Sequence, residues 1–187
     1  MLRCVADIYR NEQMHIITSA IEHHSVLNAC HALEQGGVEV SFLSVDHARR
    51  VSVEDIEAAI NSNTRLVSIM LANNEIGTVQ PIEEISRLLK GKGILFHTDA
   101  VQAVGHIPIN VKSLNVDFLT ASAHKFNGAK GTGILYKRSG LEFSPLVFGD
   151  QQEHGLRAGT ENVAGIVAAG YAIEESVGEM TERTKLL

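Results

Sequence analysis

The sequence predicts an α/β fold, a mostly parallel sheet flanked by helices. Runs rich in β-branched and apolar residues alternate along the 187 residues with segments in which apolar residues recur at helical spacing. Residues 65–72 form one continuous apolar run, which is typical of a central strand buried on both faces. Strands that alternate with helices indicate βαβ units and a sheet covered on both sides.

Six strands are expected from the apolar and β-branched runs. They cover residues 15–21, 38–45, 65–72, 94–98, 117–121 and 133–137. After the first strand, Val26, Cys30 and Leu33 recur at helical spacing until Gly36 and Gly37 stop the helix.

Three further helices follow from local signals. Ser52 is a candidate N-cap for a helix through Asn61, and Asp55 lies at the spacing of a capping box. Pro81 suits the first turn of a helix that Gly91 and Gly93 close. A long helical pattern runs from about residue 162 to 180.

Polar residues cluster where the predicted strands end. The clusters are residues 22–24, 73–75, Asp99 with Gln102, and 122–125. Because ligands of open parallel sheets bind at the carboxyl ends of the strands, these clusters are the candidate site.

The stretch from Ser122 to Gly133 contains the most reactive candidate group. Lys125 follows a serine and a histidine and precedes a glycine-rich turn. A lysine amine forms a Schiff base with an aldehyde cofactor, and small polar groups beside it bind phosphate. The run GAKGTG lacks the order of a nucleotide-binding P-loop, so it is a weak signal for that function.

Each other cluster also has a simpler interpretation. Asp99 is either an N-cap or a buried carboxylate that keeps a pyridine nitrogen protonated, with Gln102 on the same side if a helical turn follows. Residues 73–77 read as a turn, and Thr160 reads as a helix N-cap near which phosphate also binds. His23 is either a structural histidine or one that stacks on an aromatic cofactor.

No metal site is predicted. His23 and His24 are adjacent and would point to opposite faces of an extended segment, and the chain has no HExxH or Cys/His cluster. Cys4 and Cys30 lie in apolar helical patterns without CxxC spacing, so we expect two buried, inert thiols.

Composition excludes several classes of protein. The 44% hydrophobic and 20% charged residues are ordinary for a soluble globular protein, and a net charge of −6 with a pI near 5.8 argues against a nucleic-acid-binding surface. No apolar run reaches membrane-spanning length and no signal peptide is recognised at the N-terminus. We therefore expect no membrane partner, and a cytoplasmic or organellar-matrix location.

Five motifs occur in order along the chain: EHHSVL at 22–27, NNEIGTVQ at 73–80, HTDAVQ at 97–102, SAHK at 122–125 and RAGTEN at 157–162. Together they resemble the cysteine desulfurases of the NifS/IscS group, which are class-V aminotransferase-like enzymes with pyridoxal 5'-phosphate (PLP) fold type I. The resemblance runs from about residue 3 to the C-terminus. It implies that residues 1–187 are a single incomplete PLP-binding large domain, without the N-terminal loop and strand and without the small domain.

The resemblance also implies a role for each motif residue. Lys125 would carry PLP and act as a base, and Asp99 would pair with the pyridine nitrogen. His23 would stack on the ring and move protons. Gln102 and Asn74 would lie near O3′ of the cofactor, and Ser122 and His124 would bind its phosphate. Thr160 would contact the phosphate bound by the partner subunit in a homodimer.

For the complete family, the implied reaction takes sulfur from L-cysteine, leaves L-alanine and forms an enzyme persulfide for iron–sulfur cluster or other sulfur biosynthesis. A sulfur-acceptor protein is an implied partner. The family's nucleophilic cysteine and its substrate-binding arginine lie in the small domain, and neither Cys4 nor Cys30 occupies the nucleophile's place. We therefore expect this chain to be inactive alone.

Other interpretations remain open. The chain is alternatively a non-catalytic remnant or dimerisation module, a selenocysteine lyase, or another class-V PLP enzyme, because the shared cofactor site does not distinguish their substrates.

Overall fold

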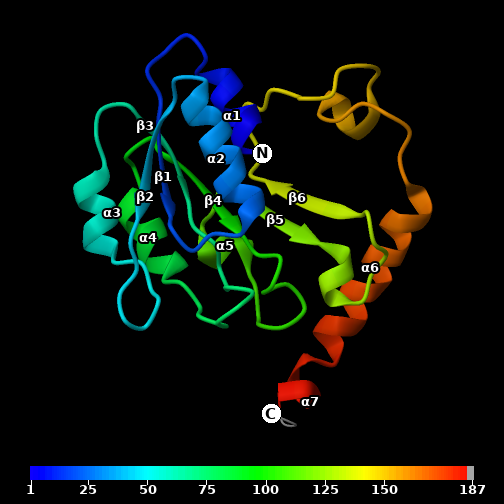
Figure 1. The fold of residues 1–187 in the computed structure, drawn as a ribbon. Helices are drawn as coiled ribbons and strands as arrows, with labels where there is room; N and C mark the ends of the chain where they lie inside the picture. The colour runs from blue at the N-terminus through cyan, green and yellow to red at the C-terminus, as the bar shows by residue number, and fades with distance from the viewer. Residues whose placement is uncertain (185–187) are drawn as a thin grey trace.

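The computed structural model describes residues 1–184 and has a single six-stranded sheet with helices on both sides (Figure 1). The strands are β1 (His15–Ser19), β2 (Glu39–Leu43), β3 (Thr64–Ser68), β4 (Leu95–Asp99), β5 (Phe118–Ser122) and β6 (Gly133–Lys137). Their order in the sheet is β2-β1-β3-β4-β5-β6, and all neighbours are parallel except β5 and β6. The predicted fold class is confirmed, and every expected strand is present. The largest difference is in β3, which was expected over residues 65–72 and ends at Ser68.

The helices are α1 (Leu2–Ile8), α2 (His24–Gln35), α3 (Val53–Ala59), α4 (Ile82–Leu89), α5 (Val111–Leu114), α6 (Val163–Gly178) and α7 (Met180–Thr184), with two 3₁₀ turns, η1 (Ala123–Phe126) and η2 (Gln152–Gly155). Four of the helices, α2 to α5, connect consecutive parallel strands as βαβ units. The short elements α5, η1 and η2 were not expected from the sequence, since single turns leave little periodicity to detect. Of the described helices, none has the length and apolar character needed to cross a membrane.

Local signals set several helix ends as predicted. The Ser52 side chain accepts a hydrogen bond from the Asp55 amide, at 3.1 Å, and thereby caps α3. Asp55 is therefore the N3 partner that the spacing predicted for one of the two capping-box bonds, while the Ser52 hydroxyl itself donates to Glu54. Pro81 is the N-cap residue of α4, one position before the first turn.

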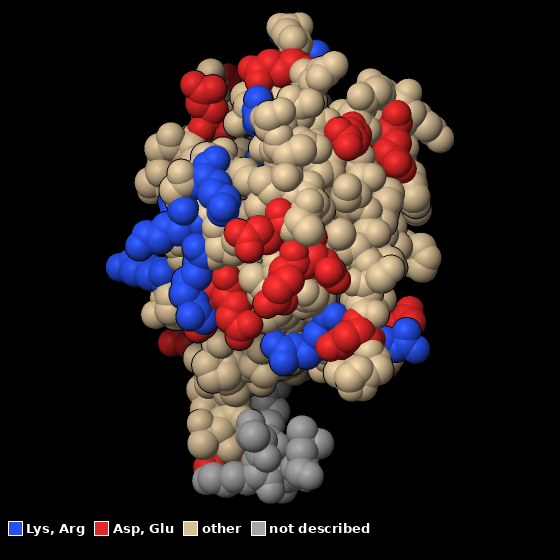
Figure 2. Space-filling view, turned by 90° about the vertical axis from the view of Figure 1, so that its left-hand side faces the viewer, with Lys and Arg blue, Asp and Glu red and all other residues tan. Residues whose placement is uncertain are grey.

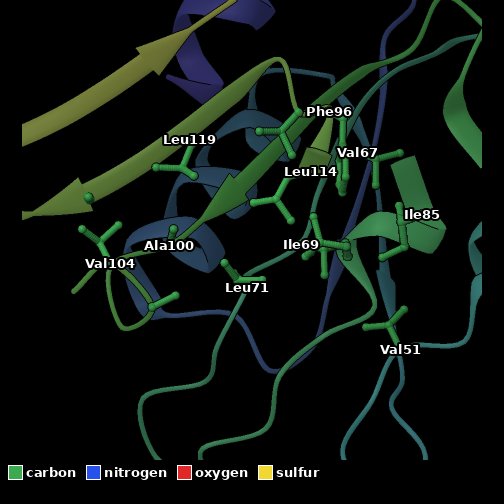
Figure 3. Packing of buried hydrophobic residues seen from close by; sticks show 14 of the residues in the cluster. Val51, Val67, Ile69, Leu71, Ile85, Phe96, Ala100, Val104, Leu114 and Leu119 are labelled. Atoms are coloured by element: carbon green, nitrogen blue, oxygen red, sulfur yellow. The ribbon is translucent and has the colours of Figure 1, made fainter. Parts of the chain in front are cut away.

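Side chains that alternate along the central strands build two cores. Ile16 and Leu66 face α1 and α2, whereas Ile17 and Val67 face the larger cluster on the other side. Figure 3 shows that larger cluster, in which Phe96 from β4 packs among aliphatic side chains of the neighbouring elements. β1 is buried along its whole length because both of its faces are covered.

The surface is mixed in charge. On the face that carries α3 and β2, acidic side chains occupy the centre and basic side chains gather along one margin (Figure 2). Cys4 on α1 and Cys30 on α2 are both free and buried, which confirms the expectation of buried thiols.

Candidate functional site

The polar clusters meet at one edge of the sheet. Residues 22–24 follow β1, residues 73–75 follow the extension of β3, and Asp99 is the last residue of β4. Lys125 lies in η1, directly after β5. Because these four strands are parallel, their carboxyl ends share an edge, and the predicted placement of the polar clusters along one edge of the sheet is confirmed (Figure 1).

Asp99 supplies a buried carboxylate at this edge. Its side chain is 6% exposed, and its Oδ1 accepts a hydrogen bond from the Val101 amide at 2.9 Å. Burial raises the pKa of Asp99 above its ordinary value, while the Val101 bond and the nearby His23 oppose that shift. Among the described residues no Lys or Arg forms an ion pair with Asp99, so the carboxylate is available to a cationic N–H of a ligand.

His23 is the N-cap of α2 and has a defined hydrogen-bonding state. Its Nδ1 accepts from the Ser25 amide at 3.2 Å and lies 2.8 Å from the Ser25 hydroxyl. Since Nδ1 accepts the amide N–H, the proton of the neutral ring is on Nε2. His23 itself has an extended backbone, with φ −60° and ψ 146°, but His24 already begins the helix. The two rings lie edge-on, with their centroids 6.4 Å apart.

The turn after β3 is built by Asn73 and presents Asn74. The Asn73 side chain accepts from the amides of Glu75 and Ile76 and donates to the carbonyl of Ile21 at 2.9 Å. Asn73 is buried, whereas Asn74 is exposed at the tip of the turn. The turn interpretation is confirmed, and the bond to Ile21 fastens this turn to the end of β1.

A hydrogen bond to its backbone carbonyl fixes the position of Lys125. Its carbonyl accepts from His106 Nε2 at 2.9 Å, and its side chain is exposed next to that of His124. Ser122 ends β5 half-buried, and its hydroxyl makes none of the capping hydrogen bonds of η1. A Cβ on Gly128 would lie 2.8 Å from the Cβ of Ala123, so glycine is needed there for close approach of the two backbones.

Gln102 lies in the helical turn that its predicted placement requires. The amides of Ala103 and Val104 both donate to the carbonyl of Ala100, which closes a turn directly after Asp99. Gln102 is half-buried on this turn. Gln102 therefore lies in the turn that directly follows the end of β4, where Asp99 is located.

Thr160 is exposed on the segment between η2 and α6. The predicted N-cap role is wrong, because the side chain of Asn162 caps α6 by accepting from the Gly165 amide at 3.1 Å. Asn162 is a strong N-cap residue that immediately precedes the apolar pattern, so the signal was present in the sequence. A contact of Thr160 with a second subunit stays a prediction.

Sequence reasoning missed a polar layer beneath the site. His97 lies two residues before Asp99, and its ring nitrogens lie 2.8 Å from Ser68 Oγ and 3.1 Å from Thr120 Oγ1. Burial lowers the pKa of His97 to about 3, so the ring is neutral and cross-links β3, β4 and β5. The period of two along β4 was the available signal, because it puts His97 and Asp99 on one face.

A cavity of about 410 Å³ opens beside this edge. It is lined by Ala20, Ile21, Glu22, His23, His24, Leu27, Arg49, Asn73, Asn74, Glu75 and Ile76. Of the predicted site residues, only two line this cavity, His23 and Asn74. The others do not, namely Asp99, Gln102, Ser122, His124, Lys125 and Thr160.

The sequence pattern of the family described as Aminotransferase class-V matches residues 2–183. This chain belongs to the class-V aminotransferases. Among curated class-V relatives, it is 51% identical over 186 residues to the cysteine desulfurase IscS of Dictyoglomus turgidum, and 51% identical to that of Methanosarcina thermophila. Both alignments cover 100% of this chain, but only 47% and 46% of the relatives.

Solved structures of the family agree with the architecture. A NifS-like protein superposes with a TM-score of 0.95 and 45% identity, over 98% of this chain and 51% of that protein. SspA, described as being in complex with cysteine, superposes with a TM-score of 0.90 and 43% identity, over 92% of this chain and 50% of SspA. The chain spans about half the length of the relatives it matches.

Proposed function

We propose that this chain is the PLP-binding part of a cysteine desulfurase. The observation that carries the proposal is that Asp99, Lys125 and His23 lie at the same carboxyl edge of the sheet. The chain that holds them is 51% identical in sequence to an IscS protein. L-Cysteine as substrate, a homodimer, and transfer of sulfur to an acceptor protein for iron–sulfur cluster assembly are parts of this proposal that rest on the family.

The residues present fit PLP in two respects. Asp99 is a buried carboxylate without a cationic partner among the described side chains, as a protonated pyridine nitrogen requires. Lys125 presents an exposed amine on a rigid turn next to the half-buried Ser122. Ser122 and His124 would hold the phosphate, and Gln102 and Asn74 would lie near O3′.

When bound, PLP supplies an electron sink for chemistry at the α-carbon of an amino acid. Asp99 would hold the pyridine nitrogen in its protonated state. Lys125 would bind the cofactor and then move a proton at its Nζ. His23 would stack on the ring and exchange the proton on Nε2, because Nδ1 is already bonded to Ser25.

Neither cysteine of the chain suits the role of sulfur nucleophile. Burial, with Glu22 and Glu34 nearby, raises the pKa of the Cys30 thiol to about 12, so Cys30 is a thiol at neutral pH. Cys4 on α1 is also buried, with 4% of its surface exposed. Completion of desulfuration therefore requires a thiolate from another segment or another chain.

The test is uptake of PLP by the purified chain. We expect a visible absorption band in the wild type and in Lys130→Ala, a matched control five residues away, and its loss in Lys125→Ala. Borohydride reduction followed by peptide mass spectrometry should place the cofactor on Lys125. A band that persists in Lys125→Ala would contradict the assignment.

A second assay separates the remaining alternatives. We expect only background sulfide from L-cysteine with this chain alone, because both of its thiols are buried. Sulfide release would contradict that expectation, and selenide release from L-selenocysteine without sulfide from L-cysteine would favour a selenocysteine lyase. Absence of any PLP uptake would favour a non-catalytic module.

A further inference from the structure

Glu22 is a buried acid at the candidate site to which the proposed chemistry assigns no role. It is 4% exposed and lies between β1 and His23. Its Oε1 accepts from the Ser19 hydroxyl at 2.6 Å and from the Met70 amide at 2.9 Å. Buried acids are usually paired with a cation, and among the described residues Glu22 forms no ion pair.

The two oxygens of Glu22 have different surroundings. Both donors converge on Oε1, while Oε2 is buried and has no hydrogen-bond partner among the described residues. This asymmetry fits a neutral carboxylic acid, in which Oε1 is the carbonyl oxygen and Oε2 carries the proton. An ionised group would leave an unpaired charge on the buried Oε2.

The charged and titratable groups around Glu22 also favour its neutral form. Burial is the largest cause that raises the pKa of Glu22 to about 8, and the nearby Asp99 adds to it, whereas the bonds from Ser19 and Met70 oppose it. Cys30 on α2 also lies within electrostatic range and is uncharged, and His23 follows directly in the chain. Of the two buried acids, Glu22 and Asp99, Asp99 is thus the one available to bind a cation.

The bonds of Glu22 also fix the segment that carries His23. Met70 lies beyond the end of β3, so its bond to Glu22 ties the loop after β1 to the neighbouring strand. The bond from Asn73 to the Ile21 carbonyl ties the same two segments one residue away. The imidazole of His23 therefore takes its position from a loop fastened at residues 21 and 22.

We infer that Glu22 is a positioning residue of the cofactor site, which holds His23 beside Asp99 by accepting hydrogen bonds from Ser19 and Met70 while Oε2 stays protonated. This inference rests on the proposed function for the identity of the ligand. The placement of His23 itself does not depend on the ligand.

The experiment compares Glu22→Gln and Glu22→Ala with the wild type, and uses Glu84→Gln on the exposed surface of α4 as control. Glutamine keeps an acceptor at Oε1 and puts a neutral N–H group in place of the protonated Oε2. We expect Glu22→Gln to keep the dissociation constant for PLP within about twofold, and Glu22→Ala to weaken binding more than tenfold. Glu84→Gln should behave as the wild type.

A readout on the cofactor-free chain separates positioning from general stability. In the NMR spectrum, the His23 ring signal should move in Glu22→Ala and stay in place in Glu22→Gln, at a temperature where far-ultraviolet circular dichroism shows both folded. Should Glu22→Ala not fold, Glu22→Asp takes its place, because the shorter side chain does not reach both donors.

Two outcomes would overturn the inference. One is an unchanged His23 signal and PLP affinity in a folded Glu22→Ala or Glu22→Asp variant. The other is a Glu22→Gln variant that behaves like Glu22→Ala, which would mean that an ionised carboxylate is required. Failure of the wild type to bind PLP would refute the proposed function, while the His23 signals would still decide the role of Glu22.

Discussion

At the scale of single residues, the structure separates groups that build the site from groups that face a ligand. Asn73 uses its side chain to close a turn, whereas Asn74 next to it is exposed. His97 is neutral and bonded on both ring nitrogens, whereas His23 keeps Nε2 available. Residues of the same type therefore have different roles. The buried Asn73 and His97 hold the structure together, whereas Asn74 and His23 have polar atoms available to a ligand.

The buried acids and bases predict a bell-shaped dependence of stability on pH. Between about pH 4.5 and 8 the folded chain binds more protons at Glu22 than the unfolded chain, so the free energy of unfolding falls as the pH rises. Between about pH 6.5 and 3 the folded chain binds fewer protons at His97, so stability falls as the pH drops. Each slope approaches about 1.4 kcal/mol per pH unit.

Urea unfolding at a series of pH values measures this profile, with greatest stability expected between about pH 4.5 and 6.5. Glu22→Gln should flatten the alkaline side and leave the acid side as in the wild type. An alkaline decline of wild-type size in Glu22→Gln would show that another group causes it.

At the scale of elements, the site depends on the packing of α6 against the turns that follow β4 and β5. The buried stripe of α6 consists of small residues, among them Ala169 and Ala172, and Ser176 donates to the carbonyl of Phe126 at 3.1 Å. Small side chains let the helix approach η1 closely. The orientation of the turn that carries Lys125 therefore depends on a helix that begins 38 residues further along the chain.

Gly105 tests this packing. Its φ is +78°, and an added Cβ would lie 2.9 Å from the Cβ of Phe126 and 3.0 Å from that of Ser176. Gly105→Ala should lower the free energy of unfolding by about 2–4 kcal/mol, from a strained backbone and overpacking together. Gly91 has a similar φ of +77° with open space around it, so Gly91→Ala should cost only about 1 kcal/mol. Equal losses in urea unfolding would contradict the packing argument.

At the scale of the whole molecule, α6 carries an apolar stripe that residues 1–184 leave uncovered. Large apolar side chains at helical spacing are exposed on it, namely Val163, Ile166, Val167, Tyr171 and Val177. This is the reverse of an ordinary amphipathic helix, in which the large apolar residues are buried. An exposed apolar stripe of this kind is typical of an interaction surface.

We therefore expect the isolated chain to self-associate through this stripe. The double variant Val167→Glu with Tyr171→Lys puts an i, i+4 ion pair on α6, which preserves the helix while removing two exposed apolar side chains. Sedimentation velocity at tens of micromolar (about 20–50 µM, near the affinity of weak interfaces) should show association of the wild type and monomers of the variant. A control charge change on α4, Glu84→Lys, should leave the association as it is, and a monomeric wild type would refute the expectation.

Local chemistry by itself determined the sheet and the edge at which the site lies. Alternation and apolar runs specified the strands, and parallel βαβ units bring Asp99 and Lys125 to one edge whatever the details of packing. Tertiary structure alone decided the protonation states of Glu22 and His97. The bonds of Glu22 to Met70 and of His97 to Ser68 and Thr120 join residues 23 to 48 positions apart. Burial and hydrogen-bond partners of this range set the pKa values of these two groups, and no local pattern encodes them.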